Sequence, residues 1–166
     1  MIMKQKITPF LWFTKNTAEE AVKFYTSVFK KSKITKVTRC DKATAKRVGC
    51  PVNSVLTVEF EIEGQQFLAL NGGSTFKFNE SISFVVNCKN QKEIDYYWKK
   101  LTARGGKEVA CGWLKDGFGV SWQVVPEQIE QWLTDPEPAA RVLAAVMQMM
   151  KLDFKKLKAA YEGKTK

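Results

Sequence analysis

Apolar and polar residues alternate most regularly between residues 58 and 63. In an extended chain, one face of this segment carries three glutamates, and the other carries Val58, Phe60 and Ile62. This is the pattern of a half-buried β-strand. Gly64 predicts a turn into a second strand over residues 66–70, which Asn71-Gly72-Gly73 ends. The alternation therefore predicts a β-hairpin with one buried face.

Earlier residues show the patterns of further strands and a helix. Apolar runs predict strands over residues 7–13 and 34–39, and helical spacing predicts a helix that runs to about Phe29. Thr17 and Glu20 have the spacing of a capping box, so Thr17 is expected to start that helix. The basic stretch that continues through Gly49 and Pro51 is expected to be a loop.

The same order of elements then recurs. We expect a strand over residues 82–88, a helix capped at Asn90, one or two short strands over 107–114 and a last strand over 120–125. The expected buried face of that helix consists of Ile94, Tyr97, Trp98 and Leu101. This is a weak repeat of about 70–75 residues. It predicts two βαβββ modules, about 5–73 and about 80–126, which should pack into one domain because each is small.

A helical extension is expected over about 127–166. Asp135-Pro136 has the pattern of a cap and first turn for its central helix, and Asp153 of a cap for its last helix. The central helix would present an apolar stripe made of Val142, Leu143, Val146, Met149 and Met150. Such a stripe favours core packing or a subunit interface over a ligand site.

Composition limits the class of protein. Apolar residues make up 45% of the 166 residues and aromatic residues 12%, enough to fill a core. No apolar run is long enough for a membrane span, and Thr8 and Pro9 interrupt any signal-peptide segment. We therefore expect a cytoplasmic protein without a membrane partner.

Two features of the chemistry restrict the functions available. The chain has no histidine, which removes the commonest general base and a favoured metal ligand. Its cysteines, at positions 40, 50, 88 and 111, include no Cys-x-x-Cys pair, so structural zinc is disfavoured. In an unsecreted chain these four cysteines are expected to be free thiols.

The net charge of +10 is concentrated between Lys30 and Arg47 and in the C-terminal tail. A nucleic-acid surface and a solvated strand edge are both open interpretations. The basic run lacks interleaved aromatic residues and any known nucleic-acid motif. Nucleic acid is therefore the less favoured partner.

Longer motifs resemble a known family. The segments Ile7-Thr-Pro-Phe-Leu-Trp-Phe13, Ala18-Glu-Glu-Ala-Val-Lys-Phe-Tyr25 and Cys111-Gly-Trp-Leu-Lys-Asp-Gly-Phe-Gly-Val-Ser-Trp-Gln-Val-Val-Pro126 resemble the PhnB-like branch of the glyoxalase/bleomycin-resistance/extradiol dioxygenase superfamily. Members are often named 3-demethylubiquinone methyltransferase-like. The resemblance implies an α+β vicinal oxygen chelate fold, in which two βαβββ modules form a cupped mixed sheet, commonly in a homodimer.

The resemblance also implies where metal ligands would fall. These positions are Pro9 or Phe10, the neighbourhood of Ala69, Ser81 and Gln123. Such a set lacks the charged carboxylates and imidazoles of a catalytic divalent site. We therefore expect no metal. No glycine-rich turn entering a helix marks a methyl-donor site either, so no cofactor is expected.

The cup that the resemblance implies would then be a binding pocket for a small aromatic or planar molecule. The candidate lining is Trp12, Phe67, Asn71, Ser81, Ser83, Trp113, Ser121, Trp122 and Gln123. Gln123 and Trp122 alternate onto opposite faces of the last strand, and either face could line the cup. An enzyme with an unusual site stays an alternative, with acid, base or nucleophile drawn from Asp116, Glu59, Cys111 or Tyr25. A basic interaction protein is the third alternative.

Overall fold

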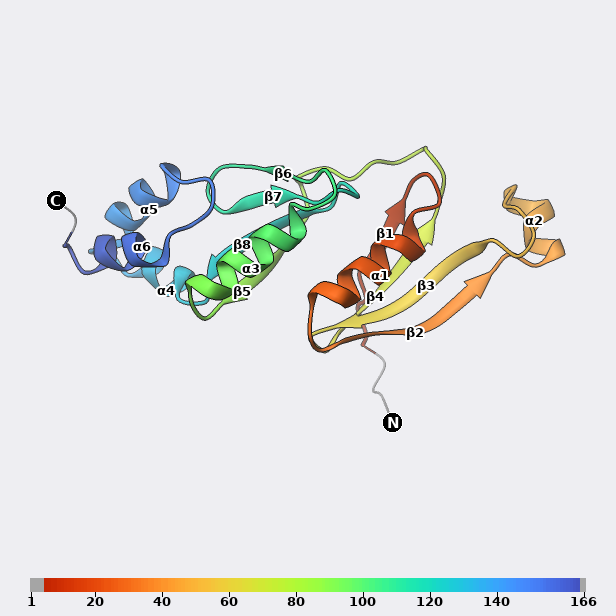
Figure 1. The fold of residues 1–166 in the computed structure, drawn as a ribbon, viewed down its shortest axis with the longest axis horizontal. Coiled ribbons are helices and arrows are strands. Elements are labelled where there is room, and N and C mark those ends of the chain that lie inside the picture. Colours follow the sequence, from red (N-terminus) through yellow and green to blue (C-terminus); the bar gives the residue numbers. More distant parts are fainter. Residues whose placement is uncertain (1–4, 165–166) are drawn as a thin grey trace. The chain divides into compact units, whose positions relative to one another are not determined.

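The structure is a computed structural model that describes residues 5–164, and it divides into two compact units. The first unit ends at Phe78 and the second begins at Asn79. Each unit contains one four-stranded mixed sheet with a helix packed on it (Figure 1). Within residues 5–164, no helix is both long and apolar enough to cross a bilayer. That the two modules form one domain stays a prediction.

The first unit has the predicted βαβββ order with one added helix. Its elements are β1 (Phe10–Phe13), α1 (Ala18–Val28), β2 (Ser32–Arg39), α2 (Lys42–Val48), β3 (Val55–Ile62) and β4 (Gln65–Asn71). The strands lie in the order β1-β4-β3-β2. β1 runs parallel to β4, and the other neighbours are antiparallel.

The core of this unit lies between α1 and the sheet. The alternation along β3 is confirmed, since Val58, Phe60 and Ile62 are 8% exposed or less. Tyr25 of α1 stacks on Phe60 with 6.4 Å between ring centroids, and Phe60 stacks on Phe67 of β4 at 5.2 Å. One face of the sheet is thus covered by α1.

The capping box predicted at Thr17 does not form. The Thr17 hydroxyl instead donates to the carbonyl of Thr14 at 2.9 Å, and Thr17 makes no side-chain cap. The amide of Ala18 donates to Oδ1 of Asn71 at 2.9 Å. The start of α1 is therefore satisfied by a side chain from the end of β4, a tertiary contact that local sequence cannot reveal.

The basic stretch predicted as a loop is helix α2. Asp41 begins it by accepting a hydrogen bond from the Thr44 amide at 2.7 Å, and Gly49 ends it in the left-handed conformation, with φ of 74°. None of its residues is buried, so it lacks the apolar face from which helices are recognised. The loop prediction was wrong for that reason.

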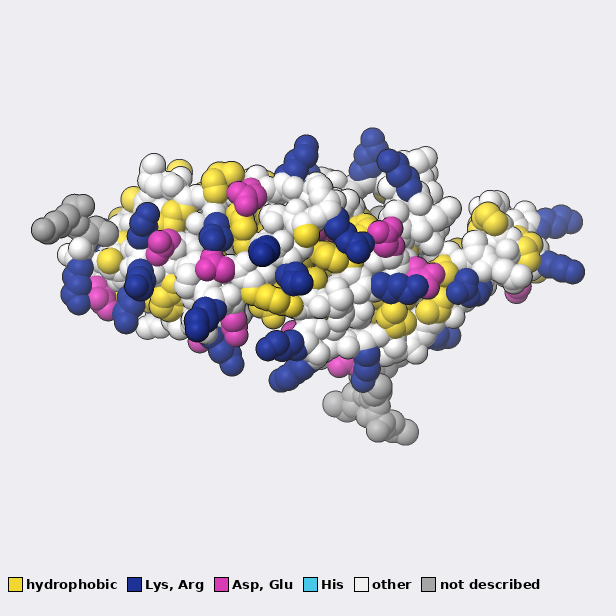
Figure 2. All heavy atoms as spheres, viewed as in Figure 1, with side chains coloured by type: hydrophobic (Ala, Val, Ile, Leu, Met, Phe, Trp, Pro, Cys, Tyr) yellow, Lys and Arg dark blue, Asp and Glu magenta, His cyan; other side chains and the backbone are white. Residues whose placement is uncertain are grey.

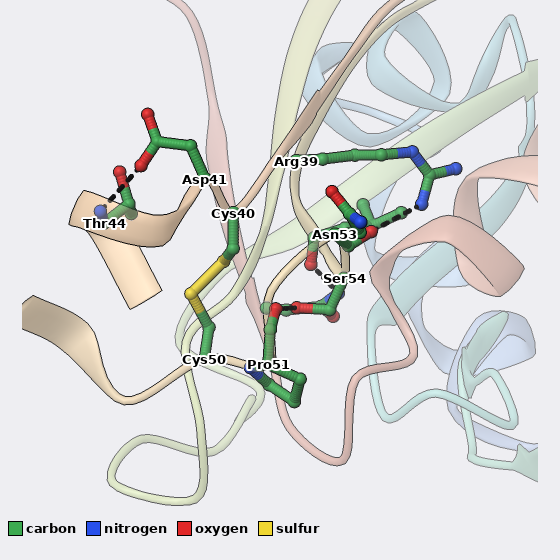
Figure 3. Close-up of a disulfide and its surroundings, with 10 residues drawn as sticks. Arg39, Cys40, Asp41, Thr44, Cys50, Pro51, Asn53 and Ser54 are labelled. Carbon is green, nitrogen blue, oxygen red and sulfur yellow. Dashed lines mark hydrogen bonds between the residues drawn. A yellow bond between two sulfur atoms is a disulfide. The ribbon is translucent and has the colours of Figure 1, made fainter. Parts of the chain in front are cut away.

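The expectation of four free thiols was also wrong. Cys40 and Cys50 flank α2 and form a disulfide (Figure 3), while Cys88 and Cys111 are free. The Cα atoms of the bonded pair lie 6.5 Å apart. Because α2 turns the chain back on itself, two cysteines that are 10 positions apart in sequence meet.

The second unit repeats the strand arrangement of the first. Its elements are β5 (Ser83–Cys88), α3 (Gln91–Leu101), β6 (Lys107–Glu108), β7 (Trp113–Lys115) and β8 (Ser121–Pro126). The strand order is β5-β8-β7-β6, with β5 parallel to β8. The predicted cap of α3 is confirmed, because Asn90 Oδ1 accepts from the Glu93 amide at 3.1 Å. The buried residues of α3 are Ile94, Trp98 and Leu101.

Three helices complete the second unit: α4 (Ile129–Thr134), α5 (Ala139–Met147) and α6 (Phe154–Tyr161). Asp153 caps α6 as predicted. Asp135 does not cap α5: it ends α4, and its carboxylate accepts a hydrogen bond from the Tyr161 hydroxyl at 2.9 Å. The predicted stripe is only partly buried, since Leu143 is 50% exposed.

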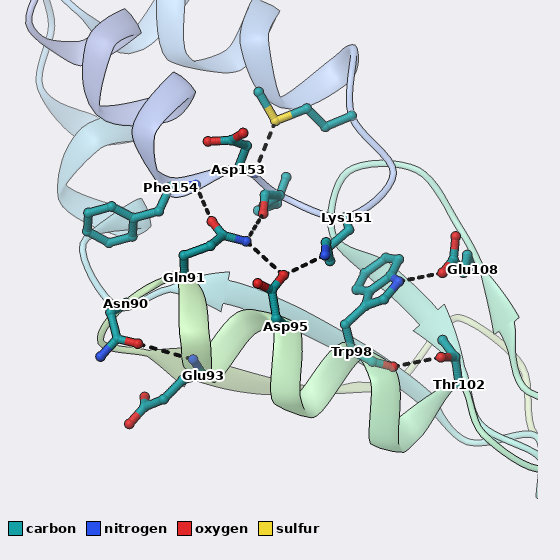
Figure 4. Close-up of polar contacts among 12 residues, drawn as sticks. Asn90, Gln91, Glu93, Asp95, Trp98, Thr102, Glu108, Lys151, Asp153 and Phe154 are labelled. Atoms are coloured by element: carbon teal, nitrogen blue, oxygen red, sulfur yellow. Dashed lines mark hydrogen bonds and ion pairs between the residues drawn. The ribbon is translucent and has the colours of Figure 1, made fainter.

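The C-terminal segment is bound to its own module. Gln91 of α3 donates to the Leu152 carbonyl at 3.2 Å and accepts from the Phe154 amide at 2.7 Å (Figure 4). Lys151 forms an ion pair with Asp95, which also belongs to α3. A cluster of buried apolar residues joins β8 to the last helices: Val125, Trp132, Val142, Val146, Leu152, Leu157 and Ala160. This extension therefore packs against one end of the second module.

Candidate functional site

The sheet of the second unit has a face opposite the one that α3 covers, and we call this the β8 open face. Its residues follow from the strand register. Gln123 of β8 pairs with Val85 of β5 and Trp113 of β7. Ser121 pairs with Ser83 and Lys115 in the same way. Directly paired residues share a face of a sheet, so these six side chains lie together.

Hydrogen bonding fixes the centre of the β8 open face. The Gln123 amide nitrogen donates to the Ser83 hydroxyl oxygen at 2.9 Å, which joins the two parallel strands. Beside this pair, Ser121 is only 2% exposed, and its Oγ has no hydrogen-bond partner. A buried hydroxyl without a partner costs about 1–3 kcal/mol. A buried hydroxyl of this kind calls for a partner such as an ordered water, an ion or a ligand.

The charge on this face is nearly balanced. Lys115, which lies across from Ser121, forms an ion pair with Glu80, and hydrogen bonding to Lys115 lowers the pKa of the Glu80 carboxyl. Trp113 is half-buried and offers an aromatic surface beside Gln123. The face can therefore make neutral hydrogen bonds and aromatic contacts.

Trp122 lies on the opposite side of β8 from Gln123. It is 4% exposed, packs against Phe84 with 5.4 Å between ring centroids, and donates from Nε1 to Asp116 Oδ2 at 2.8 Å. Asp116 also accepts from the amides of Phe118 and Val120. The structure therefore places Trp122 in the core, and Asp116 organises the turn before β8.

Trp12 is on the face of the first sheet that α1 does not cover. It pairs with Leu70, and its neighbour on the same face, Phe10, is 53% exposed. Trp12 Nε1 donates to the Gly73 carbonyl at 3.0 Å, and the indole ring contacts Phe76 edge-on at 4.9 Å. A Cβ at Gly72 would come within 2.1 Å of the indole, so glycine leaves room for the ring.

Three other predicted site residues are not members of the β8 open face: Phe67 and Asn71 belong to the first unit, and Ser81 precedes β5. Phe67 is 8% exposed and stacked in the core of the first unit. Asn71 connects α1 to the sheet, accepting from Ala18 and donating to the Val55 carbonyl at 2.9 Å. Ser81 is exposed in the segment before β5, and its amide donates to Asn79 Oδ1.

Sequence reasoning missed two members of the β8 open face, Val85 and Lys115. Both are identified by strand register, which the amino-acid pattern did not determine. The alternation of Ser121 and Gln123 was the signal that could have led to them, had the covered face of β8 been known.

The groups considered as acids, bases or nucleophiles have structural roles. Tyr25 is 1% exposed in the core, and Glu59 lies 3.6 Å from the Lys36 ammonium across β2 and β3. Cys111 is a free, partly buried cysteine that packs against the apolar cluster at the end of β8. Cys88 is fully buried, and burial raises the pKa of its thiol to about 12, which suppresses the nucleophilic thiolate.

A divalent metal does not fit the β8 open face. Its donors near Gln123 are one neutral amide and two hydroxyls, and the carboxylate of Glu80 is engaged by Lys115. Catalytic divalent ions require about three ligands of charged or imidazole type. Over residues 5–164, no three Asp, Glu, Cys or His side chains group as a metal site would need.

In each of the two βαβββ modules one edge strand runs parallel to its neighbour: β1 to β4, and β5 to β8. This arrangement defines the class of the protein, which has the vicinal oxygen chelate fold. The profile of the 3-demethylubiquinone-9 3-methyltransferase family matches residues 5–125. The chain belongs to this family, whose members include PhnB-like proteins. No curated protein matches the chain.

One solved structure agrees with the family assignment, and two more distant ones agree with the fold. A PhnB protein from Bacillus cereus is 34% identical, with a TM-score of 0.64 over 74% of this chain and 99% of that one. Protein PA1353 from Pseudomonas aeruginosa is 16% identical, with a TM-score of 0.59 over 75% and 98% of the two chains. The fosfomycin resistance protein FosX from Listeria monocytogenes, complexed with Mn(II) and sulfate, is 18% identical, with a TM-score of 0.52 over 81% and 100%.

The methyl donor that the family name implies does not fit this fold's connections either. A nucleotide-like donor usually binds where a glycine-rich turn leads from a strand into a helix. The four strand-to-helix connections within residues 5–164 are residues 14–17, 40–41, 89–90 and 127–128, and none of them contains glycine. Gly112, Gly117 and Gly119 lie in segments that join strands.

Proposed function

We propose that the chain binds a small planar or aromatic molecule on the β8 open face, without a divalent metal. The observation that carries this proposal is the unpartnered hydroxyl of Ser121, buried beside the hydrogen bond between Gln123 and Ser83. A bound molecule with a polar edge would give that hydroxyl its missing partner.

The chemistry of the face defines the ligand. Gln123 uses its amide nitrogen toward Ser83, which leaves its carbonyl oxygen to accept from a ligand N–H or O–H. The Ser121 hydroxyl can donate to a ligand oxygen, and Trp113 can stack on an aromatic ring. We therefore propose a planar compound that carries both a hydrogen-bond donor and an acceptor. A contribution from Trp12 stays a prediction.

Native mass spectrometry of gently purified protein, with metal analysis of the same sample, tests the proposal. We expect a metal-free protein that retains a small molecule, which fragmentation would identify. One tightly held metal ion per chain would contradict the proposal and favour an enzyme of the glyoxalase or dioxygenase type. The same spectra report the number of chains in the assembly.

We further propose that the protein is a cytoplasmic homodimer. Exposed apolar side chains on two edge strands support the dimer. Phe10 of β1 is 53% exposed, and Val85 of β5 is 51% exposed. Exposed apolar edges are usually covered by pairing with another chain or segment. A monomer at micromolar concentration in sedimentation velocity would contradict this proposal.

A further inference from the structure

The disulfide between Cys40 and Cys50 closes the chain around α2, at the end of the β2–β3 pair (Figure 3). Cys40 is fully buried, whereas Cys50 is partly exposed. Solvent thiols can therefore approach the pair from the Cys50 side.

Very little besides the disulfide holds α2 in place. The helix has seven residues, none of them buried, and isolated helices of that length are unstable in water. The cap from Asp41 to the Thr44 amide supports only the first turn. The disulfide adds a covalent cross-link between the residues that precede and follow α2.

The base of this segment is anchored independently. The Cys40 amide donates to the Ser54 carbonyl at 2.9 Å, and the Asn53 amide donates to the Cys40 carbonyl at 2.8 Å. Arg39 Nη1 also donates to the Asn53 carbonyl at 3.0 Å. Ser54 also donates to the Pro51 carbonyl from its amide and its hydroxyl. Loss of the disulfide would therefore release residues 41–50 and leave β2 paired with β3.

The surroundings favour exchange with thiols. Four cationic residues and one acidic residue lie between positions 39 and 58: Arg39, Lys42, Lys46 and Arg47, against Asp41. Nearby positive charge stabilises thiolates, both as attacking and as leaving groups. In the reducing environment that we propose for the protein, persistent disulfides are rare, and those that form are usually transient or redox-sensing.

We infer that Cys40 and Cys50 form a thiol–disulfide exchange site that orders α2 when oxidised and releases it when reduced by a dithiol. One thiolate of the dithiol attacks Cys50 Sγ, the sulfur–sulfur bond breaks, and Cys40 leaves as a thiolate that takes a proton from water. The second thiol of the dithiol then displaces Cys50 from the mixed disulfide. The dithiol is oxidised to its disulfide, and the protein gains two thiols.

The switch would change a basic surface. Lys42, Lys46 and Arg47 are all exposed, and Figure 2 shows Lys and Arg side chains on the surface of the α2 segment. Val48 beside them is 62% exposed. Oxidation would hold these side chains in a helix, and reduction would spread them along a flexible loop. This inference does not depend on the proposed ligand site.

Limited trypsin digestion of the full chain tests the inference. One sample is oxidised with glutathione disulfide, the other is reduced with dithiothreitol, and iodoacetamide labelling with mass spectrometry establishes the state of each cysteine. We expect cleavage after Lys46 and Arg47 to be about tenfold faster, or more, in the reduced protein, because a closed loop suppresses local opening. Cleavage after Lys23 in α1 should be unchanged.

Two variants separate the disulfide from the helix cap. Cys50→Ser should be cleaved quickly under both conditions. Asp41→Ala loses the cap and keeps both cysteines, so its cleavage should still respond to dithiothreitol. Equal cleavage of oxidised and reduced wild-type protein would overturn the inference. So would full labelling of both Cys40 and Cys50 after treatment with glutathione disulfide.

Discussion

Gln123 and Ser83, which are 40 positions apart in the chain, are joined by a 2.9 Å hydrogen bond across the parallel strands β8 and β5. The bond orients the glutamine side chain along the β8 open face and uses its amide N–H. The bond leaves the carbonyl oxygen of Gln123 to accept from another donor. This one contact converts a neutral residue into an oriented acceptor at the centre of the proposed site.

Gln123→Ala should weaken ligand binding without unfolding the protein. The change removes the oriented acceptor but no buried core side chain, so we expect a loss of affinity of about tenfold, which corresponds to about 1.4 kcal/mol. The fraction of chains that retain the copurified molecule in native mass spectra measures the effect. Gln131→Ala, which removes an exposed glutamine of α4, is the matched control. Equal retention by both variants would place the site elsewhere.

Ser121→Ala should have opposite effects on stability and on binding. In the ligand-free protein the variant removes a buried hydroxyl that has no partner, so unfolding should become less favourable by about 1 kcal/mol. For a domain of this size, that is a rise in Tm of about 3 °C. Calorimetry of ligand-free protein measures the gain, and native mass spectra should show reduced ligand retention. A lower Tm would mean that the hydroxyl has a partner in the folded protein.

Asp116→Ala should destabilise the second unit strongly. The carboxylate accepts from two backbone amides and from the Trp122 indole, and it is 3% exposed. Removing it leaves two buried donors and one partly buried donor without that acceptor, at a cost of about 3 kcal/mol. Urea unfolding followed by tryptophan fluorescence measures the change. Asp153→Ala, which removes only the α6 cap, should cost about 1 kcal/mol. Similar losses for both variants would contradict a special role for Asp116.

Strands with regular alternation were predictable from sequence, because burial on one face alone dictates their pattern. Val58, Phe60 and Ile62 are buried as expected, and the local caps at Asn90 and Asp153 form as expected. Elements that depend on distant contacts were not predictable. The start of α1 is satisfied by Asn71 from β4, and α2 has no buried residue and is flanked by the cysteines of the disulfide.

The same reason limited the prediction of the site. Sequence alternation separated Gln123 from Trp122, but only the position of α3 shows that Trp122 faces the core. Ser83 and Ser121 were recognised as candidates, yet their pairing with each other follows from the parallel register of β5 and β8. Register between strands that are far apart in sequence is a tertiary property.

Gly72→Ala should displace Trp12. An added Cβ would lie 2.1 Å from the Trp12 ring, and the ring cannot retreat without losing its hydrogen bond to Gly73 and its contact with Phe76. We expect a destabilisation of about 1–3 kcal/mol and a changed near-ultraviolet circular dichroism spectrum. Gly73→Ala is a useful comparison, because nothing lies within 4 Å of its added Cβ and only its φ of 78° resists the change. An unchanged spectrum for Gly72→Ala would contradict the observed packing of Trp12.

Cys88 should resist alkylation in the folded protein and make stability depend on alkaline pH. Burial raises the pKa of its thiol from 9.0 to about 12, so the folded protein keeps the proton that the unfolded chain releases above about pH 9. The unfolded state is therefore favoured increasingly as pH rises from about 9 to about 12. The difference in unfolding free energy between wild type and Cys88→Ala isolates this effect, because the other titrating groups are common to both proteins. It should decrease steadily with pH across that window, and iodoacetamide at pH 8 should label Cys88 only after denaturation. Rapid labelling of the folded protein would show that the thiol is not held in a dry core.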